Sequence, residues 1–369
     1  MRTLYCWLVF LGVFIRYLFW RAGVLRRRPE FTDHPEEIPT AVTQMFGWKR
    51  RVHVVNGELC PDTPPALFVA NHHKLDDPID LWPGIYWGSK GGIIPSFVMR
   101  DDFFRGFPWT WLPFNMNHLC EMTGAVLISR DHLQLGQMRQ LLGKLGKSES
   151  LVLFPGRTRS RTGAWFEYRD DITEPGSAGF IIGNAQRRHP GLRIPAVPVA
   201  RTWHPVRNTS AVVFGGAMYL AADADRAAQR ALDCALLVRV GELVEVHAVH
   251  LVAVLVWLHA LHRGNAPLPV KEIETAVADW TKSDGHPCID ARLRAAVGAE
   301  CRAALRYFAA SGLLREENSV ILPRAERILA CPPWNEHYRK TNPAKYWSNQ
   351  VLHLPGVIQW AEHTVLEGG

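Results

Sequence analysis

The first side chains in this sequence with the spacing for catalysis are His72 and Asp77, five residues apart in the segment NHHKLDDP (71–78). On a regular helix such residues point about 140° apart, so contact requires a turn or the start of a helix. The asparagine, aspartates and proline of this segment favour such a turn. Asp77 would then hold the imidazole of His72 in one tautomer, and its other nitrogen could take a proton from an alcohol. Taken alone, the segment also fits a loop histidine beside a capping aspartate.

The neighbouring His73 offers a second histidine at the same place in the chain. Its partner at the five-residue spacing is Pro78, which has no carboxylate, so the spacing selects His72. Asp76 could orient His73 only through a four-residue relation that nothing else in the chain supports. We therefore expect His72 to be the base.

Two arginine-bearing segments follow, GAVLISR (Gly124–Arg130) and LFPGRTRSRTG (Leu153–Gly163). Arg130 comes directly after an apolar run and Arg159 after a turn, so both can reach one site at the edge of a sheet. Arg157 adds positive charge beside them. Guanidinium groups donate paired hydrogen bonds that match phosphate oxygens. The alternative is a solvated loop, or a patch that binds anionic lipid.

Short apolar runs that end in proline or polar residues predict the strands that must position these side chains. They are Ala66–Ala70, Ala125–Ile128, Leu151–Phe154, Ile194–Ala200 and Ala211–Phe214. Helical patterns over Leu133–Leu145 and Gly179–Gln186 lie between them. This alternation predicts an α/β layered domain with a mostly parallel sheet flanked by helices. Sites in such domains gather where strands end.

Beyond about residue 223 the pattern is mainly helical, with few strand signals. We therefore expect an α/β domain over 61–222 and a C-terminal helical region over 223–369, preceded by a linker and lead-in over 29–60. The helical region holds several histidines at helical spacing without carboxylate partners, which is a weak indication of a metal site. They are His247, His250, His259 and His262.

The N-terminal segment, residues 1–28, joins the apolar run Leu4–Ile15 to a series of arginines that ends at Arg28. The run is shorter than the roughly 20 residues that a spanning helix needs, and no small-residue cleavage site follows it. We expect an anchoring helix that lies in the membrane interface, with arginines reaching lipid phosphates. A spanning helix and a helix buried in the protein are the alternatives.

The composition favours anionic partners, because 42 Lys and Arg stand against 35 Asp and Glu and give a net charge of +7. Nucleic acid is not expected, since no binding motif is recognisable and the apolar N-terminus would go unexplained. The seven cysteines are scattered without a Cys-x-x-Cys pair, which indicates neither a zinc site nor a disulfide framework. A reducing, cytosol-facing location follows.

Four segments, in this order, resemble the motif blocks of the glycerolipid acyltransferase superfamily. They are similar to its His-x-x-x-x-Asp, Gly-x-x-Phe-Ile-x-Arg, Phe-Pro-Glu-Gly-Thr-Arg-Ser and proline blocks, and they are His72–Asp77, Gly124–Arg130, Phe154–Ser160 and Val197–Pro198. The segments RSRTG (Arg159–Gly163) and YWSNQVLHL (Tyr346–Leu354) resemble the branch that acylates glycerol-3-phosphate and dihydroxyacetone phosphate.

The resemblance implies a membrane-associated O-acyltransferase on the cytoplasmic face of an anionic membrane. It would move a fatty acyl group from acyl-CoA or acyl-carrier protein to a glycerol-phosphate-type acceptor, with no resident cofactor and no metal. His72 would be the general base and Asp77 the residue that orients it. The residues expected to bind the phosphate or the acceptor are Arg130, Arg157, Arg159 and Ser160.

The chain departs from the family pattern in its third block, where Gly156 and Arg157 replace Glu-Gly. A carboxylate expected near the acceptor is therefore missing, and Leu127 replaces the phenylalanine of the second block. A lysophospholipid acceptor is one alternative, and a catalytically degenerate lipid-binding or scaffold protein is another. Because His72 and Asp77 are both present, we expect a changed acceptor rather than lost catalysis.

Overall fold

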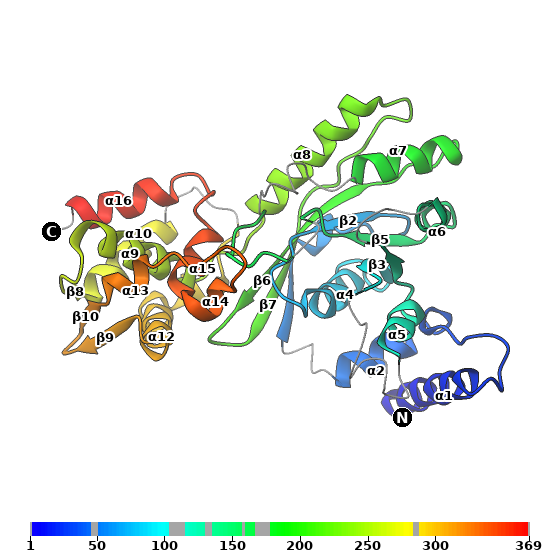
Figure 1. Cartoon of the computed structure of the whole chain (residues 1–369), viewed down its shortest axis with the longest axis horizontal. Coiled ribbons are helices and arrows are strands. Elements are labelled where there is room, and N and C mark those ends of the chain that lie inside the picture. Colours follow the sequence, from blue (N-terminus) through cyan, green and yellow to red (C-terminus); the bar gives the residue numbers. More distant parts are fainter. Residues whose placement is uncertain are drawn as a thin grey trace.

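The computed structural model describes residues 2–45, 51–102, 115–129, 135–156, 159–166, 178–282 and 288–367. Its centre is a seven-stranded sheet with the order β1-β7-β6-β2-β5-β3-β4 (Figure 1). Neighbouring strands run parallel except β6 and β7, which form an antiparallel hairpin. The strands are β1 (Val52–Val55), β2 (Leu67–Ala70), β3 (Pro95–Arg100), β4 (Val126–Ile128), β5 (Ser150–Leu153), β6 (Ala196–His204) and β7 (Thr209–Phe214). The predicted mostly parallel sheet is confirmed.

Helices cover both faces of this sheet, as Figure 1 shows for α7 and α8 on one side and α4 on the other. Alternate residues of a strand point to opposite faces. Leu67 and Val69 accordingly belong to the core under α6, α7 and α8, whereas Phe68 and Ala70 belong to the core under α4. The helices are α1 (Arg2–Arg21), α2 (Glu37–Met45), α4 (Asp77–Gly88), α5 (Met116–Met122), α6 (Leu135–Gly146), α7 (Ala178–Arg188) and α8 (Arg226–Glu242), with short 3₁₀ turns η1 (Phe31–Asp33) and η2 (Gly57–Leu59).

The sheet extends beyond the strands that the sequence predicts. β1 lies in the range expected to be a lead-in, and it pairs in parallel with β7 at the edge of the sheet. β3 begins at Pro95, a residue that ordinarily interrupts a strand but is tolerated at its first position. α8, expected in the C-terminal region, instead buries Leu236 and Val240 in the core of the sheet.

The C-terminal region surrounds α9, whose apolar residues are almost all buried. Its helices are α9 (Ala248–Arg263), α10 (Val270–Lys282), α11 (Ala291–Ala295), α12 (Val297–Ala310), α13 (Ala325–Leu329), α14 (Tyr338–Thr341), α15 (Pro343–Asn349) and α16 (Val357–Glu367). The chain is interrupted between α11 and α12 at Ala296, where φ is −149°.

The same region contains a small sheet that the sequence did not predict, with β10 (Val320–Pro323) between β8 (Leu268–Pro269) and β9 (Leu314–Glu317). Its hairpin turns at Asn318 and Ser319, which both have positive φ values, of 50° and 64°. That is the backbone of a tight two-residue hairpin turn, for which Asn-Gly is the usual sequence signal. With serine in the second position the signal is weak.

The N-terminal helix α1 runs beside α2 and α5 (Figure 1). Its 20 residues are long enough and apolar enough to cross a membrane by length and composition alone. Cys6, Val13 and Tyr17 are nevertheless buried on one side of the helix. The Tyr17 hydroxyl also accepts a hydrogen bond from the Asn115 backbone N–H at 3.2 Å. The helix is therefore packed along the protein on one side.

Candidate active site

His72 lies just past the carboxyl end of β2, and Asp77 is the first residue of α4, with Pro78 in the first turn of that helix. The Nδ1 atom of His72 is 3.0 Å from Oδ2 of Asp77. The carboxylate side chain is 1% exposed and the imidazole 19%. Because Nδ1 faces the carboxylate, Nε2 is the ring nitrogen through which His72 can take up a substrate proton. The structure thus has the turn geometry that the five-residue spacing requires.

The imidazole of His72 is also held from its face and through its backbone. Its ring stacks on Phe154, with centroids 4.3 Å apart and planes at 22°. The carbonyl of His72 accepts a hydrogen bond from the backbone N–H of Ser160 at 2.7 Å. The loop after β5 therefore fixes the loop after β2.

Asp77 is the centre of a network of donors. Its Oδ2 accepts hydrogen bonds from the backbone N–H groups of His73, at 2.6 Å, and Lys74, at 2.8 Å. Its Oδ1 lies 2.8 Å from Nη1 of Arg201. Burial alone would raise the pKa of Asp77, but the Arg201 charge, His72 and the Lys74 N–H together hold this pKa well below its ordinary value. Asp77 is therefore ionised whenever it orients His72.

Arg201, on the interior strand β6, is a site residue that the sequence analysis missed. Its side chain is 1% exposed, and its guanidinium contacts Asp80 as well as Asp77. The Asp80 carboxylate also accepts a hydrogen bond from the Ser210 hydroxyl at 2.6 Å. The Asn71 side chain bonds both backbone groups of Arg201, at 2.7 and 3.0 Å. An arginine directly after the apolar run 194–200 was the only available signal.

The ring of His73 faces the protein backbone. Its Nε2 lies 3.2 Å from the carbonyl oxygen of Ala164. Burial lowers the pKa of His73 to about 4, and the nearby Asp77 charge offsets only part of this effect. Asp76 pairs with Lys74, at 2.9 Å, and does not orient His73. The assignment of His72 as the base stays a prediction.

Of the predicted phosphate-binding residues, Arg130 and Arg157 lie outside the described residues. Arg159 is partly buried, and burial together with the nearby charges of Arg161 and Arg100 lowers the pKa of its guanidinium. Ser160 is buried, and its hydroxyl accepts a hydrogen bond from the Gly163 N–H at 3.0 Å. Ser160 thus shapes the loop that carries Arg159.

A cavity lies beside His72, between the loops after β2 and β5 and the helix α8. Its lining residues are Ala70, Asn71, His72, Pro155, Gly156, Ser160, Trp165, Phe166, Leu237 and Val240. The wall formed by Trp165, Phe166, Leu237 and Val240 is largely apolar. Gly156, which stands where the resembling family has glutamate, adds no side chain to this wall.

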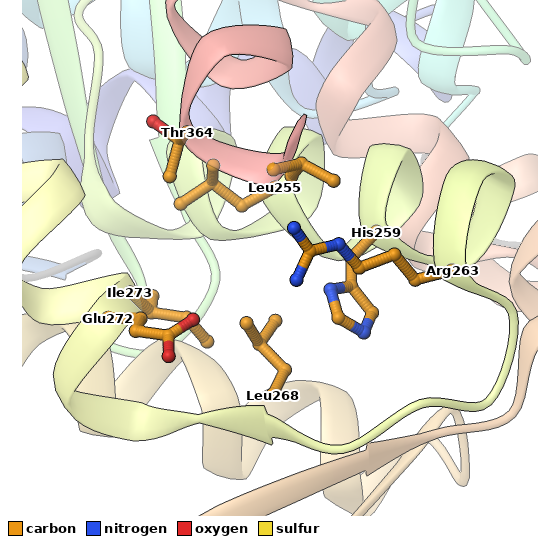
Figure 2. A pocket seen from close by; sticks show the side chains of 8 residues that line it. Leu255, His259, Arg263, Leu268, Glu272, Ile273 and Thr364 are labelled. Carbon is orange, nitrogen blue, oxygen red and sulfur yellow. The ribbon is translucent and has the colours of Figure 1, made fainter. Parts of the chain in front are cut away.

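A second cavity lies within the C-terminal region, between α9, α10 and α16. Figure 2 shows His259 and Arg263 projecting from α9 on one side of it, and Glu272 and Ile273 from α10 on the other. The Nε2 atom of His259 lies 2.8 Å from the carbonyl oxygen of Ala266. This cavity contains none of the motif residues, so it is separate from the candidate active site.

Among the described residues, one group has the spacing of metal ligands: His204, Asp290 and Glu300 place ligand atoms within 4.8 Å of one another. The Arg207 guanidinium contacts both carboxylates, and its Nη1 is 3.3 Å from Glu300. These carboxylates therefore already have a cationic partner. The group shares no residue with His247, His250, His259 and His262, whose spacing was only weak evidence for a metal site.

Comparisons with known proteins bear on part of the chain. Residues 51–200 match the family model described as Acyltransferase. None of the curated proteins matches the chain. Among solved structures, the 1-acyl-sn-glycerophosphate (LPA) acyltransferase PlsC from Thermotoga maritima is similar with 15% sequence identity and a TM-score of 0.39, over 64% of this chain and 92% of that one. The stretch that matches the Acyltransferase family therefore holds the His72–Asp77 pair and the loop after β5, whereas the C-terminal region lies outside it.

Proposed function

We propose that this protein is an O-acyltransferase that moves a fatty acyl group from a thioester to the hydroxyl of a glycerol-phosphate-type acceptor. The observation that supports this most directly is the His72–Asp77 pair, which lies in the stretch that matches the Acyltransferase family and whose carboxylate contacts Arg201. Nε2 of His72 removes the hydroxyl proton while the oxygen attacks the thioester carbonyl. The new ester forms as the carbon–sulfur bond breaks, and the thiolate leaves and takes up a proton.

The phosphate of the acceptor is assigned to the arginines around the loop after β5, of which Arg159 is described. Arg159 lies one residue from Ser160, whose backbone N–H is bonded to the carbonyl of His72. A phosphate held there would bring the acceptor's hydroxyl to the imidazole. Arg130 and Arg157 belong to the same proposal from their positions in the sequence.

The direct test is an acylation assay with purified full-length protein. Labelled palmitoyl-CoA or palmitoyl-acyl-carrier protein is supplied with glycerol-3-phosphate, dihydroxyacetone phosphate or lysophosphatidic acid. Labelled ester should appear with at least one of these phosphorylated acceptors, and comparing the two donors identifies the thioester used. If none of these pairs gives product, the enzyme proposal fails and a lipid-binding or scaffold role is favoured.

A lysophospholipid acceptor is a second candidate, favoured by the apolar cavity beside His72. The apolar side chains of Trp165, Phe166, Leu237 and Val240 would contact the acyl chain of a lysophospholipid that approaches His72, whereas glycerol-3-phosphate has no such chain. Competition in the same assay separates the two acceptors. If lysophosphatidic acid is acylated with the higher kcat/KM, the second candidate replaces the first.

Arg159→Ala should raise KM for the phosphorylated acceptor by about 10–100-fold, with a much smaller change in kcat. The reason is that a charge-assisted hydrogen bond to phosphate would be lost from bound acceptor and transition state alike. Steady-state kinetics with varied glycerol-3-phosphate measure this. Arg306→Ala on α12, outside the matched stretch, is the control. An unchanged acceptor KM for Arg159→Ala would remove Arg159 from the phosphate site.

We also propose that α1 holds the enzyme at the cytoplasmic face of an anionic membrane. Opposite its buried side, the helix exposes apolar residues at spacings of three and four, which form a single stripe. They are Leu4 at 65% exposed, Leu8 at 58%, Leu11 at 51%, Ile15 at 43% and Leu18 at 36%. Arg16 and Arg21 are exposed on the same helix and suit lipid phosphates.

Replacing Leu8 and Ile15 together with aspartate should reduce binding to vesicles of phosphatidylglycerol and phosphatidylcholine by at least ~100-fold. Each substitution removes about 1.5–3 kcal/mol of apolar burial and adds a repelling charge. Vesicle co-sedimentation measures the change. Val238→Asp on α8, which is 54% exposed, is the matched control. Undiminished sedimentation of the double variant would place the membrane contact elsewhere.

A further inference from the structure

A segment of the C-terminal region, Asn335–Asn349, is hydrogen-bonded to the loop after β5. The backbone N–H of Tyr338 donates to the carbonyl of Arg161 at 3.0 Å. Nη1 of Arg161 donates to the carbonyl of Asn335 at 2.8 Å, and the Asn349 amide donates to the carbonyl of Thr162 at 2.9 Å. Parts of the chain about 175 residues apart are thus joined at the loop that carries Arg159.

The indole of Trp203, near the end of β6, contacts two cations. One is Lys74 in the loop after β2, and the other is Arg339 in the C-terminal segment. The Nζ atom of Lys74 lies 4.0 Å from the centre of the ring, and Cζ of Arg339 lies 5.4 Å from it. Trp203 in turn packs on the buried Trp347, with ring centroids 5.8 Å apart. Since Lys74 is two residues from His72, Arg339 is positioned at the edge of the candidate active site by cation–π contacts.

Positive charge accumulates at this edge. After burial, the charges of Arg161, Arg100 and Arg339 all contribute to lowering the pKa of Arg159. At the same edge, Asp76 pairs with Lys74 and Asp77 pairs with Arg201. Within the described part of the chain, no carboxylate forms an ion pair with Arg339. Grouped cations of this kind are stabilised by a bound anion.

We propose that Arg339, together with Lys74 and Arg159, binds a phosphate group of a substrate held at His72, so that the C-terminal region completes the active site. This inference rests on the proposed acyl transfer, and it adds a binding residue from outside the stretch that matches the family. A phosphate could come from the acceptor or from coenzyme A. Both have phosphate oxygens that match a guanidinium fork.

Direct binding tests this without requiring turnover. Calorimetry of the full-length protein with glycerol-3-phosphate, and separately with coenzyme A, is compared for wild type, Arg339→Gln and Arg339→Lys. Arg339→Gln loses a charge-assisted contact, so its affinity for one of the two ligands should fall by about 10–100-fold. The affinity of Arg339→Lys should fall less, because lysine keeps the charge and can still contact Trp203. The ligand whose affinity falls identifies the source of the phosphate.

Lys340→Gln is the matched control, since it removes the same charge from an exposed neighbour on α14. Equal weakening by Lys340→Gln and Arg339→Gln would overturn the proposal, because a general field rather than a contact would then be responsible. So would unchanged affinity for both ligands in Arg339→Gln at an unchanged melting temperature. Selective weakening by Arg339→Gln supports the inference even if no acyl transfer is detected, so that the proposed function and the phosphate site are judged separately.

Discussion

Replacing His72 with alanine is expected to lower kcat for acyl transfer by about 10²–10⁴-fold, the usual contribution of a positioned general base. KM for either substrate should change little, because the imidazole acts on the proton that moves in the transition state. The melting temperature should fall moderately, since the ring is only 19% exposed and stacks on Phe154, but the variant should still fold because Asp77 stays paired with Arg201. Single-turnover formation of labelled ester, with equal occupancy of wild type and variant, measures the effect on chemistry alone.

The adjacent His73 provides the control. His73→Gln retains a donor that can reach the carbonyl of Ala164, and within the described residues no carboxylate is bonded to the imidazole of His73. We expect this variant to retain kcat within about an order of magnitude, even if it is less stable. A result in which His73→Gln lost as much activity as His72→Ala would contradict the assignment of the base.

The sequence predicts the centre of the fold well because the central strands are short, fully buried apolar runs. All four residues of β2 are buried, and such strands produce a continuous apolar signal. Two of the strands that escaped prediction lack that signal. β1 has one buried residue in four, and β9, with the sequence LREE, likewise has one. β1 depends on pairing with the distant strand β7, and β9 depends on its hairpin with β10.

The candidate site also has a part that the local sequence predicts and a part that it does not. His72 and Asp77 are close in sequence, so turn chemistry predicts their contact. Arg201 and its partner Asp80 are 121 residues apart, and their contact exists only because β6 lies next to β2 in the sheet. A lone arginine after an apolar run is typical of a strand that reaches the surface, whereas this one is buried. Long-range ion pairs of this kind cannot be inferred from local pattern.

That buried cation leads to the largest expected effect on stability. Arg201→Met should lower the free energy of unfolding at pH 7 by about 3–5 kcal/mol, because it leaves Asp77 and Asp80 as neighbouring buried carboxylates without their cation. Chemical denaturation followed by tryptophan fluorescence measures the change. Arg193→Met, which removes a cation beside the ring of Tyr219, is the control and should cost far less.

The pH dependence shows whether the cause is charge or packing. In the native protein the pKa of Asp77 lies below its ordinary value of 3.8, so its ionised form contributes stability above that pH, and this contribution is lost as pH falls through the lower, folded pKa. Without Arg201, burial acts unopposed by that charge and the pKa of Asp77 rises, so the folded variant can take up a proton as the pH falls. The deficit of Arg201→Met should therefore shrink as pH falls from 7 toward 4, and adding Asp80→Asn should recover part of it at pH 7. A deficit that is independent of pH and unaffected by Asp80→Asn would mean that lost packing, and not an unpaired carboxylate, destabilises the variant.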